Sequence, residues 1–266
     1  MAVPAISIIL RTLGRAQLPD ALASLASQTR RDFEVVVVDM SGGTIAPLLE
    51  RFAPRLPALR VVASPRCARP KALNAGIAAA SAPVIGILDD DNLYDPAQVE
   101  ILLAGLESTQ AAYVYAGVRD TTYSTGGEWI ATREVVRPFV FDELLGSNFI
   151  YATGSALRKS LWERVGGYDE RFDVLEDWDF LIRAAQAGTI ASLGVIAGES
   201  RKFTGIAGAS TFNLEVARVC RCYARIHWKH RRLYLARRLR FGGLARRGWR
   251  FVRLFTDHLR NGSRSH

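Results

Sequence analysis

The sequence predicts an α/β protein with a Rossmann-like, mostly parallel sheet flanked by helices, and three observations carry this prediction. Over the first 118 residues, short apolar runs rich in β-branched side chains alternate with segments of helical periodicity, a pattern typical of parallel strands joined by helices. The composition, with 49% apolar and 23% charged residues in a chain of 266, is that of a globular protein with a sizeable core. Polar and charged side chains follow several of the apolar runs, at the edge where parallel sheets bind ligands.

The first half contains the most regular elements. Apolar runs predict strands, and apolar side chains at helical spacing predict helices between them. Pro83 ends one helix and Pro96 lies in the first turn of the next. The predicted strands are 6–10, 33–38, 59–63, 84–88 and 112–118, and the predicted helices are 19–28, 47–52, 71–80 and 96–106.

After residue 118 the alternation weakens. A polar segment with Gly126-Gly127 at its middle predicts a hairpin over 120–137. Glycines follow two of the later helices and end them. The predicted elements are a helix at 142–145, a strand at 155–158 and helices at 159–165 and 177–187. We expect a body of residues 1–217, divided into halves 1–118 and 119–217, and a tail of residues 218–266.

Charge separates this tail from the body. The net charge is +9, yet residues 218–266 hold 15 Lys and Arg and one acid, Asp257. The tail therefore carries +14 and the body −5. Apolar side chains at 249, 252, 255 and 259 fall on one helical face among arginines, which predicts a basic amphipathic helix that binds a membrane surface. The alternative is a helix packed on the body with a solvated basic face.

Several protein classes are disfavoured by composition. No apolar run approaches the ~18 residues that cross a bilayer, and the first ten residues lack the pattern of a signal peptide. Three cysteines in a spacing that suits no zinc site predict reduced thiols in a cytoplasmic protein. Nucleic acid is disfavoured as a partner, because the body is acidic and no nucleic-acid-binding motif is present.

Three consecutive carboxylates, Asp89, Asp90 and Asp91, end the predicted strand 84–88. Like charges this close repel one another unless a cation neutralises them. Carboxylate oxygens are the ligands that Mg²⁺ and similar hard ions prefer. The triplet after a buried strand therefore predicts a metal site, with a solvated acidic loop as the alternative.

Four other motifs have both a functional and an ordinary structural interpretation. Arg11, Thr12 and Arg15 follow the first strand and suit a phosphate or an ordinary loop. Asp39 ends the second strand and suits a nucleoside or a helix cap. Cations that include Lys71 precede the helix 71–80 and suit a phosphate or solvent. Glu176 and Asp177 start the last predicted body helix and suit a general base or ordinary capping.

Seven segments in this order resemble the family 2 glycosyltransferases, which have the GT-A fold. The resemblance covers about residues 5–215, and each piece alone is only moderately specific. The segments are Ile6-Ser7-Ile8-Ile9, Val37-Val38-Asp39, Lys71-Ala72-Leu73-Asn74-Ala75-Gly76, Leu88-Asp89-Asp90-Asp91, Gly154-Ser155-Ala156-Leu157-Arg158, Gly166-Gly167-Tyr168-Asp169-Glu170 and Glu176-Asp177-Trp178-Asp179.

The resemblance implies an inverting transfer of a sugar from a nucleotide-diphosphate donor to an acceptor hydroxyl. It makes residues 1–118 the nucleotide-binding half and 119–217 the acceptor half. The implied donor-site residues are Arg11, Thr12 and Arg15 beside the nucleotide, Asp39 at the base, and Asp89 to Asp91 as the D-x-D element. In that element Asp89 lies near the ribose, Asp91 binds Mn²⁺ or Mg²⁺ with Asp89, and Asp90 is a spacer within the donor site. Asp177 corresponds to the catalytic base, and Glu176 to a residue beside the donor sugar or acceptor.

The sequence departs from the family pattern at three places. Many members have a second acid after position 39, where this chain has Met40. Many have Arg before the Asn of the third segment, where this chain has Leu73, so Lys71 is expected to supply the charge. Many use a downstream His near the diphosphate, but this chain has no His before residue 227. We expect Lys202, in the pair Arg201-Lys202, to take that place.

The resulting prediction is a metal-dependent glycosyltransferase at the inner face of the membrane, with a UDP-sugar as donor and a glycan or lipid-linked intermediate as acceptor. Donors with dTDP or GDP stay open. One alternative is an Asp-dependent phosphotransferase or phosphatase, disfavoured because the acidic cluster comes late and continues as Asn92-Leu93. Another is a non-catalytic sugar-nucleotide-binding protein, disfavoured by the intact Asp89, Asp91 and Asp177.

Overall fold

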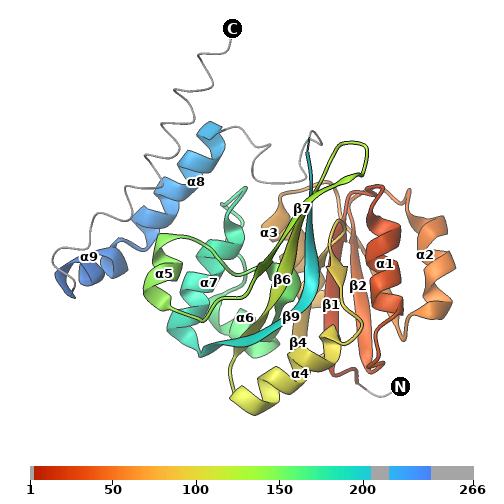
Figure 1. Ribbon diagram of the computed structural model, residues 1–266, viewed down its shortest axis with the longest axis horizontal. Helices are drawn as coiled ribbons and strands as arrows, with labels where there is room; N and C mark the ends of the chain where they lie inside the picture. The colour runs from red at the N-terminus through yellow and green to blue at the C-terminus, as the bar shows by residue number, and fades with distance from the viewer. Residues whose placement is uncertain (1–2, 205–215, 241–266) are drawn as a thin grey trace, which may run out of the picture.

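The computed structural model describes residues 3–204 and 216–240 and contains one curled sheet covered by helices (Figure 1). The sheet has nine strands in the order β3-β2-β1-β4-β8-β6-β9-β5, and β7 pairs with β6 outside this path. The strands are β1 (Ile6–Thr12), β2 (Phe33–Asp39), β3 (Leu59–Ala63), β4 (Val84–Asp89), β5 (Leu93–Tyr94), β6 (Tyr113–Tyr123), β7 (Trp129–Val135), β8 (Ser155–Arg158) and β9 (Ile190–Phe203). The predicted fold class is confirmed.

The first four strands of this path, β3, β2, β1 and β4, are parallel to one another. Their residues are apolar on both faces because helices cover both sides of the sheet. On one side, Ile8 and Leu10 of β1 pack with α1 (Leu18–Ala26), α2 (Ala46–Phe52) and α4 (Gln98–Thr109). On the other, Ile9 packs with α3 (Arg69–Ala79) and the later helices. A Cβ at Gly76 would lie 2.6 Å from Ile9 Cγ2, so glycine permits the close approach of α3.

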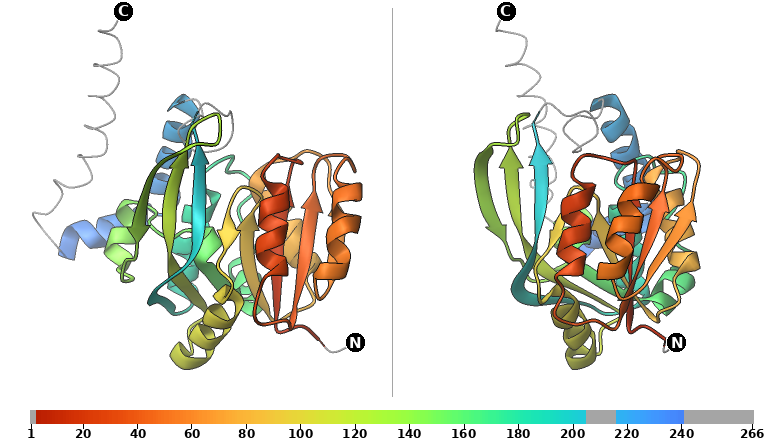
Figure 2. Two further views of the ribbon diagram at one scale, coloured as in Figure 1. Left: turned by 45° about the vertical axis from the view of Figure 1, so that its right-hand side comes forward. Right: turned by 90° about the vertical axis from the view of Figure 1, so that its right-hand side faces the viewer.

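The other half of the sheet is mixed. Strand β8 runs antiparallel to both β4 and β6, whereas β9 runs parallel to β6. The predicted hairpin is confirmed, since β6 and β7 pair antiparallel and Gly127 adopts φ +84° in the turn between them. Figure 2 shows β6, β7 and β9 rising beside the half that carries α1 and α2, which gives the sheet its curl. Strands β5 and β9 are not among the predicted elements.

Five helices complete the described residues. They are α5 (Phe141–Gly146), α6 (Lys159–Val165), α7 (Glu176–Ala187), α8 (Val216–Lys229) and α9 (Arg231–Arg240). Helix α8 buries Cys222 and Ile226 in the same core cluster as Trp178 of α7. Tyr234 of α9 donates a hydrogen bond to the Leu145 carbonyl at 2.8 Å. The beginning of the basic tail thus packs on the body, whereas its apolar face at residues 249–259 lies outside the described residues.

The division at residues 217 and 218 stays a prediction, and α8 starts at Val216, on the body side of it. None of the described helices is both long and apolar enough to cross a membrane.

Candidate active site

The carboxyl ends of β1, β2 and β4 lie side by side, as the alternation of strands and helices predicts. In the sheet, Arg11 of β1 is opposite Asp89 of β4, and Thr12 is opposite Asp39 of β2. The side chains of three predicted motifs therefore meet at one edge of the parallel half.

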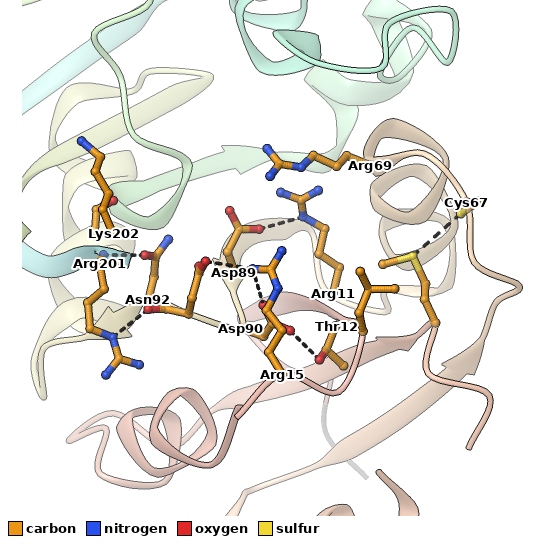
Figure 3. Close-up of a pocket in the computed structure, with 14 residues that line it drawn as sticks. Arg11, Thr12, Arg15, Cys67, Arg69, Asp89, Asp90, Asn92, Arg201 and Lys202 are labelled. Atoms are coloured by element: carbon orange, nitrogen blue, oxygen red, sulfur yellow. Dashed lines mark hydrogen bonds and ion pairs between the residues drawn. The ribbon is translucent and has the colours of Figure 1, made fainter. Parts of the chain in front are cut away.

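The Asp triplet is bonded to the loop that follows β1 (Figure 3). Arg11 Nε donates to Asp89 Oδ1 at 2.7 Å, and Thr12 Oγ1 donates to Asp90 Oδ2 at 2.6 Å. Arg15 Nη1 donates to Asp91 Oδ2 at 2.8 Å and to Asp90 Oδ1 at 3.2 Å. Each acid of the triplet thus has a partner at the end of β1 or in the loop that follows it.

These contacts separate the acids electrostatically. Burial acts to raise the pKa of Asp89, but the Arg11 guanidinium outweighs it, so that this pKa is lowered. Burial and repulsion from Asp89 raise the pKa of Asp91 to about 6, despite the opposing effect of Arg15. The charge of Asp91 is therefore the less compensated of the two, which is the condition that a bound cation would relieve.

A cavity of about 220 Å³ opens over the triplet, and we call it the triplet cavity. Five Arg and Lys side chains line it together with the three acids, so the wall presents several cationic hydrogen-bond donors suited to the oxygens of an anionic ligand. Its charged lining comprises Arg11, Arg15, Arg69, Arg201, Lys202 and Asp89 to Asp91, and its remaining lining is Thr12, Leu13, Met40, Cys67, Asn92 and Ser200.

The donor set of this cavity fits a divalent metal bound together with a phosphate-bearing ligand. Among the described residues, no group of three or more His, Cys, Asp and Glu side chains is arranged to hold a metal ion. Ions such as Mg²⁺ are commonly bound by one or two carboxylates together with substrate phosphates and water. Asp89 and Asp91, both in the lining, supply such a pair.

A second cavity of about 430 Å³ adjoins the first, and we call it the α7 cavity. The two cavities share Asp89, Asn92 and Ser200 in their linings, so they lie side by side. Asp177, at the start of α7, lies in the wall of the second cavity. The remaining lining is Arg133, Val135, Arg137, Asn148, Phe149, Ile150, Tyr151, Ala152 and Thr153.

The start of α7 holds its two acids in different surroundings. Leu175, which precedes them, adopts φ +61°, a conformation that costs a non-glycine residue about 1 kcal/mol. Asp177 accepts hydrogen bonds from Asn148 Nδ2 at 2.9 Å and from the Trp178 backbone N–H at 2.8 Å. Glu176 lies 3.9 Å from Arg11 Nη1 and is 4% exposed.

Both acids are harder to ionise than an exposed carboxyl. Burial, followed by repulsion from Asp177, raises the pKa of Glu176 to about 7. Burial also raises the pKa of Asp177, despite the Trp178 N–H and the nearby arginines. A carboxylate with a raised pKa is a stronger base, which suits proton abstraction from a hydroxyl.

The backing of α7 comes from the C-terminal helices. Asp179 is fully buried and bonds to His230 Nε2 at 2.9 Å, to Lys229 Nζ at 2.8 Å and to Arg183 Nε at 2.9 Å. The ring of Trp178 lies 5.2 Å from that of Tyr223 on α8. Of the two acids that start α7, Asp177 lines the α7 cavity and Glu176 is buried near Arg11, and the next two residues anchor the helix to α8.

Not every predicted site residue lines a cavity. Both oxygens of Asp39 accept bonds from its own loop, from Ser41 N at 2.7 Å and from Gly43 N at 3.1 Å, and Met40 lines the triplet cavity beside it. Lys71 is exposed on α3, where Arg69 lines the cavity instead. Asp90 is buried against Thr12 but lies in the lining of the triplet cavity, as does Lys202. Their roles stay predictions.

Sequence reasoning did not select four polar residues that line these cavities or bond to their walls. Arg69 is the first residue of α3, which starts at residue 69 and not at the predicted residue 71. Pro70, which suits the first turn of a helix, is the sequence signal for this earlier start. Asn92 follows the triplet, and its Oδ1 accepts from the Arg201 backbone N–H at 2.8 Å. Arg201 Nε donates to the Asp91 carbonyl at 2.7 Å. Asn148 lies in a loop without a motif, so no sequence signal marks it.

Fold and site together define a GT-A glycosyltransferase, with a half of parallel strands, an acidic triplet at the end of β4 and an acid pair at the start of α7. The sequence profile described as glycosyl transferase family 2 matches residues 7–166. The chain belongs to this family of enzymes. Family membership decides against the phosphotransferase alternative.

Curated relatives agree with this assignment. The chain is 31% identical over 217 residues to a PGL/p-HBAD biosynthesis glycosyltransferase of Mycobacterium bovis, which covers 77% of this chain and 80% of that protein. It is 25% identical over 183 residues to the uncharacterized glycosyltransferase YwdF of Bacillus subtilis, which covers 68% of each chain.

Solved structures share the fold. TarS 1-349 of S. aureus in complex with UDP-GlcNAc matches with a TM-score of 0.62 and 17% identity, over 85% of this chain and 72% of that chain. In a structure of the longer TarS chain, the match covers 36% of its length. The mannosyltransferase PcManGT of Pyrobaculum calidifontis, in complex with GDP-Man and Mn²⁺, matches with a TM-score of 0.62 and 21% identity, over 87% of this chain and 65% of that chain.

Proposed function

We propose that the protein transfers a sugar from a nucleotide-diphosphate donor, a UDP-sugar in the first instance, to the hydroxyl of a glycan or lipid-linked acceptor with inversion at the anomeric carbon. The observation that carries this proposal is the pair of neighbouring cavities, one lined by cations and the Asp triplet and the other by Asp177. A diphosphate suits the first cavity because five cations face three acids there. The neighbouring structures with UDP-GlcNAc and with GDP-Man support nucleotide-sugar binding at this fold.

In this proposal the residues of the triplet cavity bind and orient the donor. Arg11, Arg15, Arg69 and Lys202 offset the charge that develops on the diphosphate as the anomeric C–O bond breaks. Asp91 and Asp89 would hold Mn²⁺ or Mg²⁺, which supplies further charge stabilisation at the leaving diphosphate when bound. Leu13, Met40 and Cys67 give the outer part of the cavity an apolar wall suited to a nucleoside.

Asp177 is the general base of the proposed reaction. Its Oδ2 accepts from Asn148 and its Oδ1 from the Trp178 N–H, so the carboxylate is held in one orientation. Its position in the adjoining cavity lets it take the proton of a hydroxyl that attacks from the side opposite the diphosphate. Glu176 lies beside Arg11 and would contact the donor sugar or the acceptor.

The experiment compares Asp177→Asn with Asp173→Asn, an exposed acid in the segment just before α7. A panel of UDP-, dTDP- and GDP-sugars with and without Mn²⁺ is first screened by thermal shift, because a ligand of the native state raises apparent stability. We then expect Asp177→Asn to lower turnover of the selected donor by about 10²–10⁴-fold with unchanged donor affinity, and Asp173→Asn to behave as wild type. Full turnover in Asp177→Asn would refute the assigned base, and retention at the anomeric carbon of the product would refute inversion.

We also propose that the segment 218–266 attaches this cytoplasmic enzyme to the inner face of the membrane. In its described part, Trp228 is 71% exposed and the Arg231 guanidinium lies 4.9 Å from its ring, a combination that suits a lipid interface. Because α9 packs on the body, the test deletes residues 241–266 only. Attachment is supported if the deletion abolishes sedimentation of the protein with anionic vesicles and does not change its sedimentation with zwitterionic vesicles. Unchanged sedimentation with anionic vesicles would refute a role of residues 241–266.

A further inference from the structure

A buried carboxylate, Asp120 of β6, holds one cation of each cavity. Its side chain is 3% exposed, and it lies 2.7 Å from Lys202 Nζ and 2.7 Å from Arg133 Nη2. Tyr151 also donates its hydroxyl to Asp120 at 3.0 Å. The sheet explains the arrangement, because β6 lies between β7, which carries Arg133, and β9, which carries Lys202.

One carboxylate is therefore shared by two cations, and the cluster of Asp120, Lys202 and Arg133 keeps one uncompensated positive charge. Burial alone would raise the pKa of Asp120, but its bonds to Lys202 and Arg133 lower it, so the acid is ionised at neutral pH. Lys202 lines the triplet cavity, whereas Arg133 and Tyr151 line the α7 cavity. The two cations that share Asp120 therefore lie in the walls of different cavities, Lys202 in that of the triplet cavity and Arg133 in that of the α7 cavity.

Arg137 adds a second guanidinium to the same wall of the α7 cavity. Its guanidinium lies 4.7 Å from the ring centroid of Phe149, and its Nη2 donates to Glu143 at 2.5 Å. The Arg137 and Glu143 side chains are 45% and 50% exposed, so solvent screens this pair and leaves the guanidinium available to another anion. We call Arg133, Arg137 and Tyr151 the arginine rim.

The two acids that line the α7 cavity, Asp89 and Asp177, accept bonds from Arg11 and from Asn148 rather than from the arginine rim. A substrate that carried an anion would be repelled by these carboxylates and attracted to the guanidinium groups. Arginine presents paired N–H donors that match the oxygens of phosphate and carboxylate. A molecule with an oxyanion and a nearby hydroxyl would therefore bind in one direction, with the hydroxyl toward Asp177.

We propose that the arginine rim binds an oxyanion, phosphate or carboxylate, carried by the acceptor near the hydroxyl that receives the sugar. The proposal rests on the proposed function, because it takes the α7 cavity as the acceptor site. It assigns Arg133 and Arg137 to acceptor specificity and makes Asp120 a positioning residue that holds Arg133 toward the acceptor and Lys202 toward the donor.

The test uses three sugars that differ only at C6: methyl glucoside, methyl glucuronide and methyl glucoside 6-phosphate. Their binding is measured by protein-observed NMR or calorimetry, with and without saturating UDP and Mn²⁺. We expect at least one of the two anionic sugars to bind about tenfold or more tightly than the neutral sugar, as one or two charge-assisted hydrogen bonds provide. The stronger of the two identifies phosphate or carboxylate as the oxyanion.

Arg133→Gln, Arg137→Gln and the double variant then test the rim. We expect the double variant to bind all three sugars within about twofold of one another, and each single variant to lose part of the preference. The matched control is Arg30→Gln, which breaks a single-carboxylate pair with Asp32 just before β2, at the opposite end of the strand from the site. It should keep the full preference.

Equal binding of the three sugars to the wild type would overturn the proposal, as would an anion preference that survives in the double variant. Thermal unfolding and UDP–Mn²⁺ affinity report whether each variant is folded, and Arg137→Gln, at an exposed pair, keeps the test valid if Arg133→Gln is unstable. Failure of the wild type to bind UDP, dTDP or GDP with Mn²⁺ would refute the proposed function instead, and the titrations without nucleotide would still decide whether the rim binds an oxyanion.

Discussion

Replacing Glu176 by glutamine should stabilise the protein at alkaline pH. The side chain is 4% exposed, and burial together with repulsion from Asp177 raises its pKa from 4.5 to about 7. A carboxyl whose pKa is higher in the folded state binds its proton more tightly there, so its stabilising contribution is complete below pH 4.5. That contribution is lost progressively as the pH rises through 7.

The magnitude follows from the shift. A difference of one pKa unit corresponds to 1.36 kcal/mol, and the shift from 4.5 to about 7 therefore gives about 3 kcal/mol. Glutamine imitates the protonated acid at every pH. We expect Glu176→Gln to match the wild type at pH 4.5 and to exceed its free energy of unfolding by up to about 3 kcal/mol at pH 8.

The assay is urea unfolding of wild type and variant at several pH values between 4.5 and 8, compared as differences so that other titrating groups cancel. Glu163→Gln is the matched control, since it makes the same change at an exposed position of α6 and should show no such trend. A Glu176→Gln variant that is equally stable or less stable than the wild type at pH 8 would refute the reasoning. It would show that the interaction with Arg11 outweighs burial.

Three further predictions concern metal, thiol and helix anchoring. Asp91→Asn should weaken UDP binding in the presence of Mn²⁺ about tenfold or more and leave UDP binding without metal nearly unchanged, as calorimetry would measure; an unchanged Mn²⁺ dependence would contradict its role. UDP with Mn²⁺ should slow alkylation of Cys67, which lines the triplet cavity, but not of the exposed Cys220; mass spectrometry that finds equal protection of both would contradict the nucleotide site. Asp179→Asn removes the buried carboxylate that bonds to Arg183, Lys229 and His230, and should cost about 3 kcal/mol, or roughly 6–12 °C in Tm, in a thermal melt; a shift under a degree would show that these bonds do not anchor α8.

The parallel half of the fold was predictable because local and global signals agree there. Runs such as 33–38 are apolar on both faces, and a helix signal separates each from the next, so sequence alone gives strands, helices and their direction. Strand β9 was not predicted, because Gly194 and Gly198 interrupt its alternation and its pairing with β6 shifts register twice. A strand of two residues, β5, is too short to leave a pattern.

The site was predictable where a residue lies at the end of a predicted strand. Arg11, Thr12 and the triplet follow from that position, because parallel strands end at the same edge. Lys71 and Asp39 show the limit of this reasoning, since two positions along the helix, just over half a turn, decide whether Arg69 or Lys71 lines the cavity, and loop hydrogen bonds decide where a carboxylate points. Arg133 and Tyr151 come from the hairpin and a loop, whose place over the sheet depends on pairings between distant segments.

The four residues 176–179 join the proposed chemistry to the basic C-terminal segment. Asp177 lines the α7 cavity, whereas Trp178 packs on Tyr223 and Asp179 bonds to His230, both from the C-terminal segment. The residues next to Asp177 in α7 are therefore held by contacts with the C-terminal segment. A segment that reads in sequence as a separate tail therefore begins as part of the support for the proposed base.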